Sequence, residues 1–243
     1  MPLVGLLGHQ VSYSASPAMQ NAGFRAAGLS DWSYELFDVA PEDLPAAVAA
    51  LRLPGRAGAN VTIPHKRAVM ALLDEVDETA TAIGAVNFIS REGDRLIGGN
   101  TDVAGVSAAL LEVGWTGGRA LILGRGGSAM AAAFALLPEV VTFVTRDNWE
   151  LRGALARDSD LVINCTPLGR AGEMPLAPAD LPRQAVIDLV YVTGGTPLVA
   201  SARVAGRRVA DGWSVLLAQG AASFTGWTSL PAPLPAMREA LPL

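Results

Sequence analysis

One stretch decides the fold: Ala120-Leu121-Ile122-Leu123-Gly124-Arg125-Gly126-Gly127-Ser128-Ala129. A short apolar strand passes through glycines into an alanine-rich segment, which we predict to be a helix ending at Pro138. The glycines permit a tight turn and let backbone N–H groups approach a pyrophosphate, whose charge is stabilised at a helix N-terminus. The pattern therefore favours a dinucleotide-binding unit, and a glycine-rich turn without a ligand is the alternative interpretation.

The next predicted strand, Val140 to Thr145, ends in Thr145-Arg146-Asp147. A dinucleotide fold places the group that recognises the adenine ribose at this strand end, about 20 residues beyond the glycines. Arg146 favours the 2′-phosphate of NADP, whereas Asp147 favours the free 2′-hydroxyl of NAD. A third interpretation is a pair of ordinary solvated charges. We expect NADP, with NAD as the alternative cofactor.

Outside this unit, short apolar runs alternate with helical patterns, which predicts an α/β protein. The predicted strands are Leu3–Leu7, Ser33–Phe37, Gly58–Val61, Val86–Ser90, Arg95–Gly98, Leu161–Asn164 and Val186–Leu189. The last two are typical of parallel strands buried on both faces. The predicted helices are Pro17–Ala27, with Ser16 as its N-cap, Leu44–Leu53, and Ser214–Trp227. Pro231, Pro233 and Pro235 then impose an extended linker before a short terminal helix.

Composition excludes several classes of protein. The 243 residues are 51% hydrophobic and 17% charged, which predicts a buried core rather than disorder. A net charge of −5 without a basic cluster argues against nucleic acid as a partner. The longest apolar run, Ala129–Leu137, is too short to span a membrane. Cys165 is the single cysteine and the N-terminus lacks the pattern of a signal peptide, so we expect a cytoplasmic protein. The only histidines, His9 and His65, lack clustered partners, so we expect no metal site.

Polar residues cluster at or near the ends of the predicted strands in the first hundred residues, where open α/β sheets bind ligands. Ser14 and Ser16 precede a helix and offer hydroxyl groups to a carboxylate, although simple N-capping by Ser16 explains them as well. Lys66 closes the segment Asn60–Lys66, and Asp102 closes Asn100-Thr101-Asp102. Lys66 and Asp102 form the candidate catalytic pair, against the alternative of two ordinary solvated charges.

The order of these motifs resembles the shikimate dehydrogenase family over nearly the whole chain. The matching segments are Gly8–Pro17, Asn60–Lys66 (Asn-Val-Thr-Ile-Pro-His-Lys), Gly84–Asn87, Gly99–Gly105, Asn164–Pro167, Asp188–Tyr191, Asp211–Trp213 and Gln219–Trp227. The resemblance implies an N-terminal α/β substrate domain with a mixed sheet, formed by residues 1–102 plus 214–243. Residues 103–213 would form a shortened, Rossmann-like dinucleotide-binding domain.

The resemblance also implies an activity: the reduction of 3-dehydroshikimate to shikimate with NADPH, in the chorismate pathway of aromatic amino acid biosynthesis. Lys66 and Asp102 become catalytic because ketone reduction needs a proton and electrostatic help at the oxygen. The implied substrate ligands are Ser14, Ser16, Thr62, Asn87, Tyr191 and Gln219. The implied cofactor ligands are Gly124, Arg125, Gly126, Gly127, Ser128, Ala129, Thr145, Arg146, Asp147, Thr166, Leu189 and Gly212.

The match departs from the family pattern at several points, and these keep alternatives open. Only 17 positions separate Val144 from Leu161, fewer than the family uses there. Arg125 replaces a small residue in the glycine turn, and Phe88 replaces a threonine. The alternatives are a dehydrogenase of quinate or an aminoshikimate-type substrate, and a catalytically silent paralogue that binds shikimate-like ligands. The oligomeric state is left open between monomer and homodimer.

Overall fold

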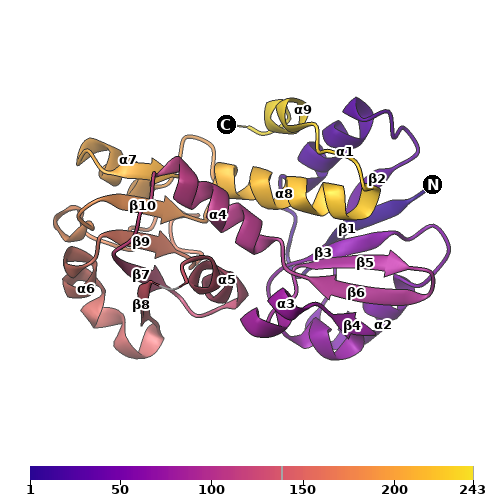
Figure 1. Cartoon of the computed structure of the whole chain (residues 1–243), viewed down its shortest axis with the longest axis horizontal. Helices are drawn as coiled ribbons and strands as arrows, with labels where there is room; N and C mark the ends of the chain where they lie inside the picture. Colours follow the sequence, from indigo (N-terminus) through magenta and orange to yellow (C-terminus); the bar gives the residue numbers. More distant parts are fainter. Residues whose placement is uncertain (138, 243) are drawn as a thin grey trace. The chain divides into compact units, whose positions relative to one another are not determined.

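Two separate β-sheets organise the chain (Figure 1). The computed structural model describes residues 1–137 and 139–242. Unit 1 consists of Met1–Thr101 and Gln219–Pro242, and unit 2 of Asp102–Ala218. Each unit contains one of the two sheets. The α/β architecture with a mixed sheet and a parallel, Rossmann-like sheet confirms the predicted fold class.

Unit 1 contains a six-stranded mixed sheet in the order β2-β1-β3-β5-β6-β4. The strands are β1 (Leu3–Gly8), β2 (Ser33–Asp38), β3 (Gly58–Val61), β4 (Glu75–Val76), β5 (Phe88–Glu92) and β6 (Arg95–Gly99). Strand β1 is parallel to β2 and to β3, and the direction then reverses because β5 and β6 form an antiparallel hairpin. This sheet places the end of β3 next to the end of β1.

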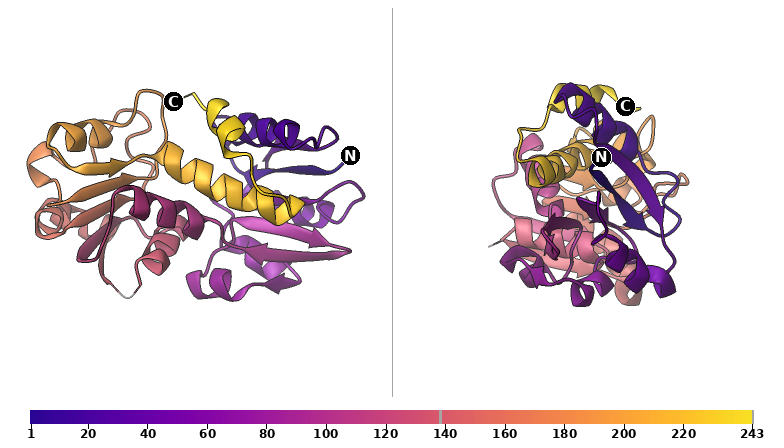
Figure 2. Two further views of the ribbon diagram at one scale, coloured as in Figure 1. Left: turned by 45° about the horizontal axis from the view of Figure 1, so that its top comes forward. Right: turned by 90° about the vertical axis from the view of Figure 1, so that its right-hand side faces the viewer.

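Helices cover the sheet of unit 1. They are α1 (Ser16–Ala26), α2 (Leu44–Ala50), α3 (Glu78–Ile83), the part of α8 (Gly212–Thr228) from Gln219 onward, and α9 (Leu234–Glu239). Short 3-10 helices, η1 (Pro41–Asp43) and η2 (Ala68–Leu72), lie between them. Helix α9 lies against α1 (Figure 2). Phe24 of α1 stacks on Phe224 of α8 at 5.4 Å, so the chain's last helices complete this core.

Unit 2 contains a five-stranded sheet in the order β11-β10-β9-β7-β8, in which every pair is parallel. Its strands are β7 (Arg119–Leu123), β8 (Val140–Val144), β9 (Leu161–Asn164), β10 (Ala185–Asp188) and β11 (Arg208–Ala210). The central strands β9 and β10 are fully buried, as their uninterrupted apolar sequences predict. Strand β8 forms one edge of the sheet.

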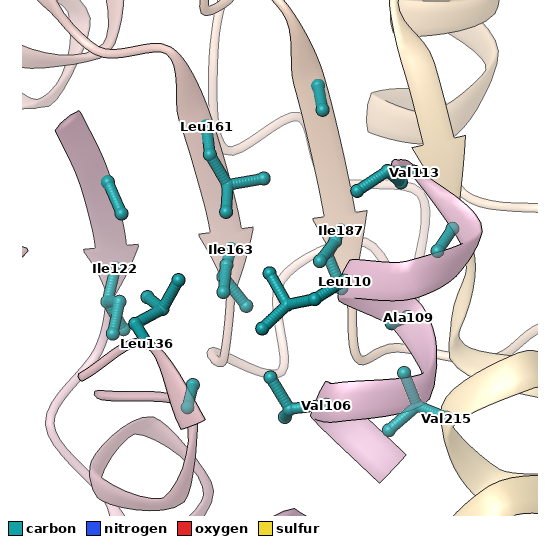
Figure 3. Packing of buried hydrophobic residues seen from close by; sticks show 14 of the residues in the cluster. Val106, Ala109, Leu110, Val113, Ile122, Leu136, Leu161, Ile163, Ile187 and Val215 are labelled. Atoms are coloured by element: carbon teal, nitrogen blue, oxygen red, sulfur yellow. The ribbon is translucent and has the colours of Figure 1, made fainter. Parts of the chain in front are cut away.

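Helices complete unit 2 on both sides of its sheet. They are α4 (Asp102–Glu112), α5 (Gly127–Ala135), α6 (Arg152–Asp158), α7 (Pro197–Val204), and the first part of α8, with the 3-10 helices η3 (Arg146–Leu151) and η4 (Pro178–Asp180). On one side, Val106 and Leu110 of α4 pack on Ile163 and Ile187 of the sheet, with Val215 of α8 beside them (Figure 3). This packing fixes the N-terminus of α4, where Asp102 lies.

Several predicted boundaries are wrong. The predicted strand Val86–Ser90 runs instead from Phe88 to Glu92, because Val86 bonds to the Lys66 carbonyl outside the ladder. The predicted helix Leu44–Leu53 ends at Ala50, and the alanine-rich helix ends at Ala135; its expected end, Pro138, lies outside the described residues. The short elements β4, α3 and β11 were not predicted, since two to six residues give too little periodic signal.

Candidate active site

The two serines of the first motif lie at the start of α1. The Ser16 N–H donates to Ser14 Oγ at 3.2 Å, a local turn that draws Ser16 into the first turn of the helix. Ala15 is therefore the N-cap residue and makes no side-chain capping bond, so the prediction that Ser16 caps the helix is wrong. Because the Ser16 N–H is bonded to Ser14, Pro17 has no N–H group and the Met19 N–H donates to the Ala15 carbonyl at 3.2 Å, the hydroxyl groups of the two serines are what this helix start offers to an anion.

The loop from Thr62 to Lys66 follows β3, and three hydrogen bonds anchor it to neighbouring segments. The Thr62 N–H donates to the Leu7 carbonyl at 2.9 Å, and the buried His65 ring bonds to the Val39 carbonyl at 2.8 Å. The Val86 N–H donates to the Lys66 carbonyl at 2.8 Å. These bonds fix the backbone of half-buried Lys66, and they account for His65 as a satisfied core residue.

Asn87 is buried and bonds to Thr101. Its Oδ1 accepts from the Thr101 backbone N–H at 2.6 Å, and its Nδ2 donates to Thr101 Oγ1 at 3.1 Å. Thr101 directly precedes Asp102, so Asn87 also fixes the backbone that leads into α4. The predicted substrate contact of Asn87 remains a prediction, and the structure assigns its amide this second task.

Asn60 is the centre of a buried network that the sequence analysis did not identify. It accepts from the Tyr34 hydroxyl at 3.0 Å and donates to the Asn87 carbonyl at 3.1 Å and to Ser223 Oγ at 2.8 Å. Ser223 Oγ in turn lies 3.0 Å from Thr101 Oγ1. The network therefore joins β2, β3, the end of β6 and α8. An asparagine inside a strand is the signal that identifies it, because asparagine is depleted in strands.

Gln219 belongs to the same part of α8. Its carbonyl accepts from Ser223 Oγ at 3.0 Å, and the next carbonyl, that of Gly220, accepts from the Gln20 side chain at 2.8 Å. A Cβ on Gly220 would lie 2.2 Å from the end of Met19, so this turn of α8 packs directly on α1. Unit 1 thereby contains Ser14, Ser16, Thr62, Lys66, Asn87 and Gln219 among the predicted site residues.

The glycine-rich turn of unit 2 joins β7 to α5 as predicted. Gly124 has φ +103°, a backbone conformation that favours glycine because other residues are strained there. Gly126 is the N-cap residue of α5 without a side-chain capping bond, and a Cβ at Gly126 would meet no atom within 4 Å. Open space in front of an uncapped helix N-terminus fits a phosphate group, so these residues fit a dinucleotide. Gly127 begins α5, and Ala129 is fully buried.

Ser128 connects the glycine turn to Asp102. Its hydroxyl donates to Asp102 Oδ2 at 3.1 Å, which joins the first turn of α5 to the first residue of α4. The carboxylate of the candidate catalytic residue and the glycine turn are therefore directly linked within unit 2. Lys66 belongs to unit 1, whereas Asp102 belongs to unit 2.

The end of β8 carries the residues predicted to recognise the adenine ribose. Thr145 is the N-cap of η3: its Oγ1 accepts from the Asp147 N–H at 3.3 Å, and Asn148 Oδ1 accepts from the Thr145 N–H at 2.7 Å. Arg146 and Asp147 are exposed on the first turn. Thr145 thus has a capping role, and contacts of these three residues with a cofactor remain a prediction.

A second buried network links the ends of β9 and β10. Asp188 Oδ1 accepts from Asn164 Nδ2 at 2.9 Å and from the Val190 N–H at 3.0 Å, while Oδ2 accepts from the Thr196 hydroxyl at 2.6 Å. Asn164 also accepts from Thr166 Oγ1 at 2.7 Å and so fixes the loop after β9. Burial raises the pKa of the Asp188 carboxyl to about 6, although the three donors oppose the shift.

The remaining predicted residues of unit 2 follow β10. Tyr191 packs on Trp213 with ring centroids 5.0 Å apart, and Trp213 Nε1 donates to the Val192 carbonyl at 3.2 Å. A Cβ on Gly212 would lie 2.5 Å from the Val190 carbonyl carbon, so this glycine is required by the chain's own packing. Leu189 lies half-buried between Asp188 and the Tyr191 loop.

Within residues 1–137 and 139–242, no group of three or more His, Cys, Asp or Glu side chains is arranged to hold a metal ion. In the same part of the chain, no helix combines the length and apolar character needed to cross a bilayer.

The two-sheet α/β fold with a glycine-rich turn between β7 and α5 is the architecture of solved NADP-binding dehydrogenases. A family model for the shikimate dehydrogenase substrate binding domain matches residues 6–89, and one for the shikimate 5'-dehydrogenase C-terminal domain matches residues 212–241. The chain belongs to the shikimate dehydrogenase family, which confirms the resemblance found in its motifs.

Relatives match over almost the whole chain. The shikimate dehydrogenase (NADP(+)) of Moorella thermoacetica is 44% identical over 98% of this chain and 92% of its own length, and that of Geobacter metallireducens is 39% identical over 98% and 94%. A Thermus thermophilus shikimate 5-dehydrogenase, solved with NADP(H) and shikimate, superposes with a TM-score of 0.88 at 35% identity, covering 99% of this chain and 98% of that one. A Listeria monocytogenes shikimate 5-dehydrogenase, solved with shikimate and NAD, gives 0.83 at 27% identity, with coverages of 98% and 96%.

The chain is shorter than these relatives inside the matched region. The alignment with the Moorella thermoacetica protein runs over 272 residues, which exceeds the 243 residues of this chain by 29. At least 29 residues of that alignment therefore have no counterpart here, and the shortening of the cofactor domain stays a prediction.

Proposed function

We propose that this protein is an NADP-dependent shikimate dehydrogenase that reduces 3-dehydroshikimate to shikimate, reversibly, in the pathway to the aromatic amino acids. The observation that carries the proposal is the 44% identity to a shikimate dehydrogenase (NADP(+)) over 98% of the chain. The serine pair at the start of α1 and the anchored Lys66 loop are consistent with it.

Unit 1 is proposed as the substrate domain. Shikimate carries a carboxylate and several hydroxyl groups, and the hydroxyl groups of Ser14 and Ser16 at the start of α1 suit the carboxylate. Thr62, Asn87 and Gln219 of unit 1 and Tyr191 of unit 2 are proposed ligands for the remaining polar groups of the substrate. Phe88, which departs from the family pattern, packs on Trp227 with centroids 5.4 Å apart, so core packing accounts for its ring.

Unit 2 is proposed as the NADP domain, and NADPH supplies the hydride when bound. The first N–H groups of α5 would hold the pyrophosphate in the open space before Gly126, with Ser128 and Ala129 in the same turn. Thr166, Leu189 and Gly212 are proposed to border the nicotinamide. The bonds of Asn164 to Thr166 and of Asp188 to the Val190 N–H hold these loops in place.

Lys66 and Asp102 are proposed as the catalytic pair. Reduction of a ketone leaves negative charge on oxygen, so a proton must be supplied there. Lys66 Nζ supplies that proton and stabilises the developing charge, and Asp102 accepts a hydrogen bond from a substrate hydroxyl. The Ser128 hydroxyl holds the Asp102 carboxylate in position for this bond.

The test is oxidation of shikimate followed by the absorbance of reduced nicotinamide, with NADP+ or NAD+ and with quinate in place of shikimate. Turnover of shikimate with NADP+ supports the proposal. Preference for quinate contradicts the substrate assignment, and binding of shikimate without turnover by either cofactor indicates a catalytically silent relative.

Lys66→Met tests the catalytic assignment. Loss of a general acid costs about 100-fold or more in rate, so we expect turnover to fall by at least that factor while calorimetry still detects shikimate binding. Arg67→Met, at the neighbouring exposed residue, is the matched control and should retain turnover. Near-normal turnover of Lys66→Met would contradict the assignment.

We also propose that the protein acts in the cytoplasm as a monomer or a homodimer. The single cysteine, half-buried Cys165, has no second cysteine in the chain to pair with, and the absence of an internal disulfide is usual for cytoplasmic proteins. Analytical ultracentrifugation distinguishes the two oligomeric states.

A further inference from the structure

The sheet of unit 2 lacks the outer strand that usually lies beside β8. The usual doubly wound order is 3-2-1-4-5-6, and β8, β7, β9, β10 and β11 correspond to strands 2, 1, 4, 5 and 6. Residues 145–160 connect β8 to β9 through only η3 and α6, without a strand. The shortening relative to the longer relatives is best placed here, because this connection is the one that loses a sheet strand.

The end of β8 carries a poor charge balance for a phosphate group. Arg146 is exposed there, but the exposed carboxylates of Asp147 and Glu150 belong to the same short helix η3. Within η3, one guanidinium beside two carboxylates gives no net positive charge. Arg152, the C-cap residue of η3, donates to the Trp149 and Pro175 carbonyls instead. A 2′-phosphate at this strand end therefore needs a second cation from another element.

Arg125 is placed to supply that cation. Leu123 of β7 pairs with Val144 of β8, and the Gly124 N–H continues the pairing to the Val144 carbonyl at 2.8 Å. Arg125 and Arg146 each follow their paired residue by two positions, so both emerge at the same edge of the sheet. The Arg125 guanidinium lies 5.9 Å from the centre of the Phe143 ring, which shows that the side chain extends from the glycine turn towards β8.

We propose that Arg125 and Arg146 together bind the 2′-phosphate of NADP, and that Arg125 is a specificity-determining residue for the cofactor in this chain. The inference rests on the proposed NADP-dependent function. Two guanidinium groups from adjacent strand ends offset the carboxylates of η3 and offer paired N–H donors to phosphate oxygens. Arg125 thus takes part in recognition from the glycine turn, on a side of the sheet where the outer strand is absent.

The experiment measures binding of NADP+ and NAD+ by calorimetry to the wild-type protein, Arg125→Ala, Arg146→Ala and a control. Arg119→Ala is the matched control, because Arg119 is exposed at the opposite end of the same strand β7. Charge-assisted bonds to one phosphate predict about 10- to 100-fold weaker NADP+ binding for either arginine variant. NAD+ binding should change less than about threefold, since NAD+ lacks the 2′-phosphate.

Arg125→Lys separates geometry from charge. Lysine keeps the positive charge but not the paired donors, so its NADP+ affinity should lie between those of the wild type and Arg125→Ala. Unfolding temperatures of the variants, compared with the wild type, exclude general loss of folding.

Three results overturn the proposal: equal weakening of NADP+ and NAD+ by Arg125→Ala, no weakening at all, or a wild-type protein that binds NADP+ no more tightly than NAD+. The proposed function fails in a different way. Absence of shikimate turnover with either cofactor would overturn it, while the two nucleotide affinities would still decide the role of Arg125.

Discussion

The two units each bury a polar network at strand ends, but the two networks differ in charge. In unit 1, Asn60 connects Tyr34 and Ser223 through amide and hydroxyl groups alone. In unit 2, the Asp188 carboxylate connects Asn164 and Thr196. Both networks fix the loops that carry proposed site residues.

The difference shows that a buried network can fix a loop either with neutral groups alone or with a carboxylate whose charge is costly to bury. Neutral amides buried with complete hydrogen bonding carry no charge into the core. A buried carboxylate carries a charge into the core, and the free-energy cost of burying that charge raises the pKa of Asp188. We therefore expect the network of unit 1 to be insensitive to pH and that of unit 2 to respond to it.

Asn60→Ala should give the largest effect. It removes three hydrogen bonds and leaves the Tyr34 hydroxyl, Ser223 Oγ and the Asn87 carbonyl without this partner, so we expect a loss of about 4 kcal/mol in the free energy of unfolding of unit 1. Hydrogen exchange of the β3 and β5 amides, measured at pH 5 and pH 8, reports it locally.

Tyr34→Phe is the control for this variant, because it removes only one bond of the network. It should cost about 1 kcal/mol. If Asn60→Ala were no more harmful than Tyr34→Phe, or if its cost depended strongly on pH, the description of a connected neutral network would be wrong.

Asp188→Asn should remove a pH dependence of stability from unit 2. The pKa of Asp188 is raised from 3.8 to about 6, so the folded protein binds a proton that the unfolded chain has released between these values. The free energy of unfolding therefore gains about 3 kcal/mol from this group as the pH falls from about 6 to about 4, and loses it as the pH rises again. Asparagine does not titrate in this range. Urea unfolding at about pH 6 and about pH 4 should therefore show this gain in the free energy of unfolding for the wild type and not for Asp188→Asn.

Glu173→Gln provides a control of opposite sign. Hydrogen bonds from its own backbone N–H and from the Gly169 and Ala171 N–H groups, the last two at 3.0 Å, lower the pKa of the Glu173 carboxyl. Its contribution to stability is therefore lost as the pH falls, whereas that of Asp188 is gained. If the free energies of unfolding of the wild type and of Asp188→Asn changed with pH in the same way, burial of Asp188 would have no energetic consequence.

Ser128→Ala should give the smallest effect on stability. Its bond to Asp102 lies in a half-buried position, where water replaces a lost partner, so we expect less than about 1 kcal/mol in thermal unfolding. The rate of shikimate oxidation should fall more than stability does, because Asp102 loses a positioning bond. A large loss of stability with an unchanged rate would instead make the bond purely structural.

The sequence was most informative where glycine and apolar patterns coincide. The strands Gly58–Val61 and Leu161–Asn164 and the turn at Gly124 are found as predicted, because a buried strand and an obligatory glycine each leave a local signal. The N-cap at Ser16 was wrong because the helix begins at Ser16 itself, whose N–H donates to the Ser14 hydroxyl, so Ala15 is the N-cap residue.

The networks were harder to predict because their members are far apart in the chain. Asn60 and Ser223 are separated by 163 positions, and no local pattern connects them. Their only local signal is a polar residue within an otherwise apolar strand, as at Asn60, Asn164 and Asp188. The orientation of Arg125 towards β8 likewise required the strand register.

The division of unit 1 between the two ends of the chain has a consequence for the order of folding during synthesis. All of unit 2 has been translated before the ribosome reaches Gln219, whereas unit 1 still lacks Ser223, Phe224 and Trp227 at that moment. Trp227 Nε1 donates to the Ile89 carbonyl across 138 positions. The first hundred residues therefore cannot complete their packing until the last helices have been synthesised. We therefore expect the nascent chain to expose unfinished surface of unit 1 to chaperones for longer than that of unit 2, although unit 1 begins first.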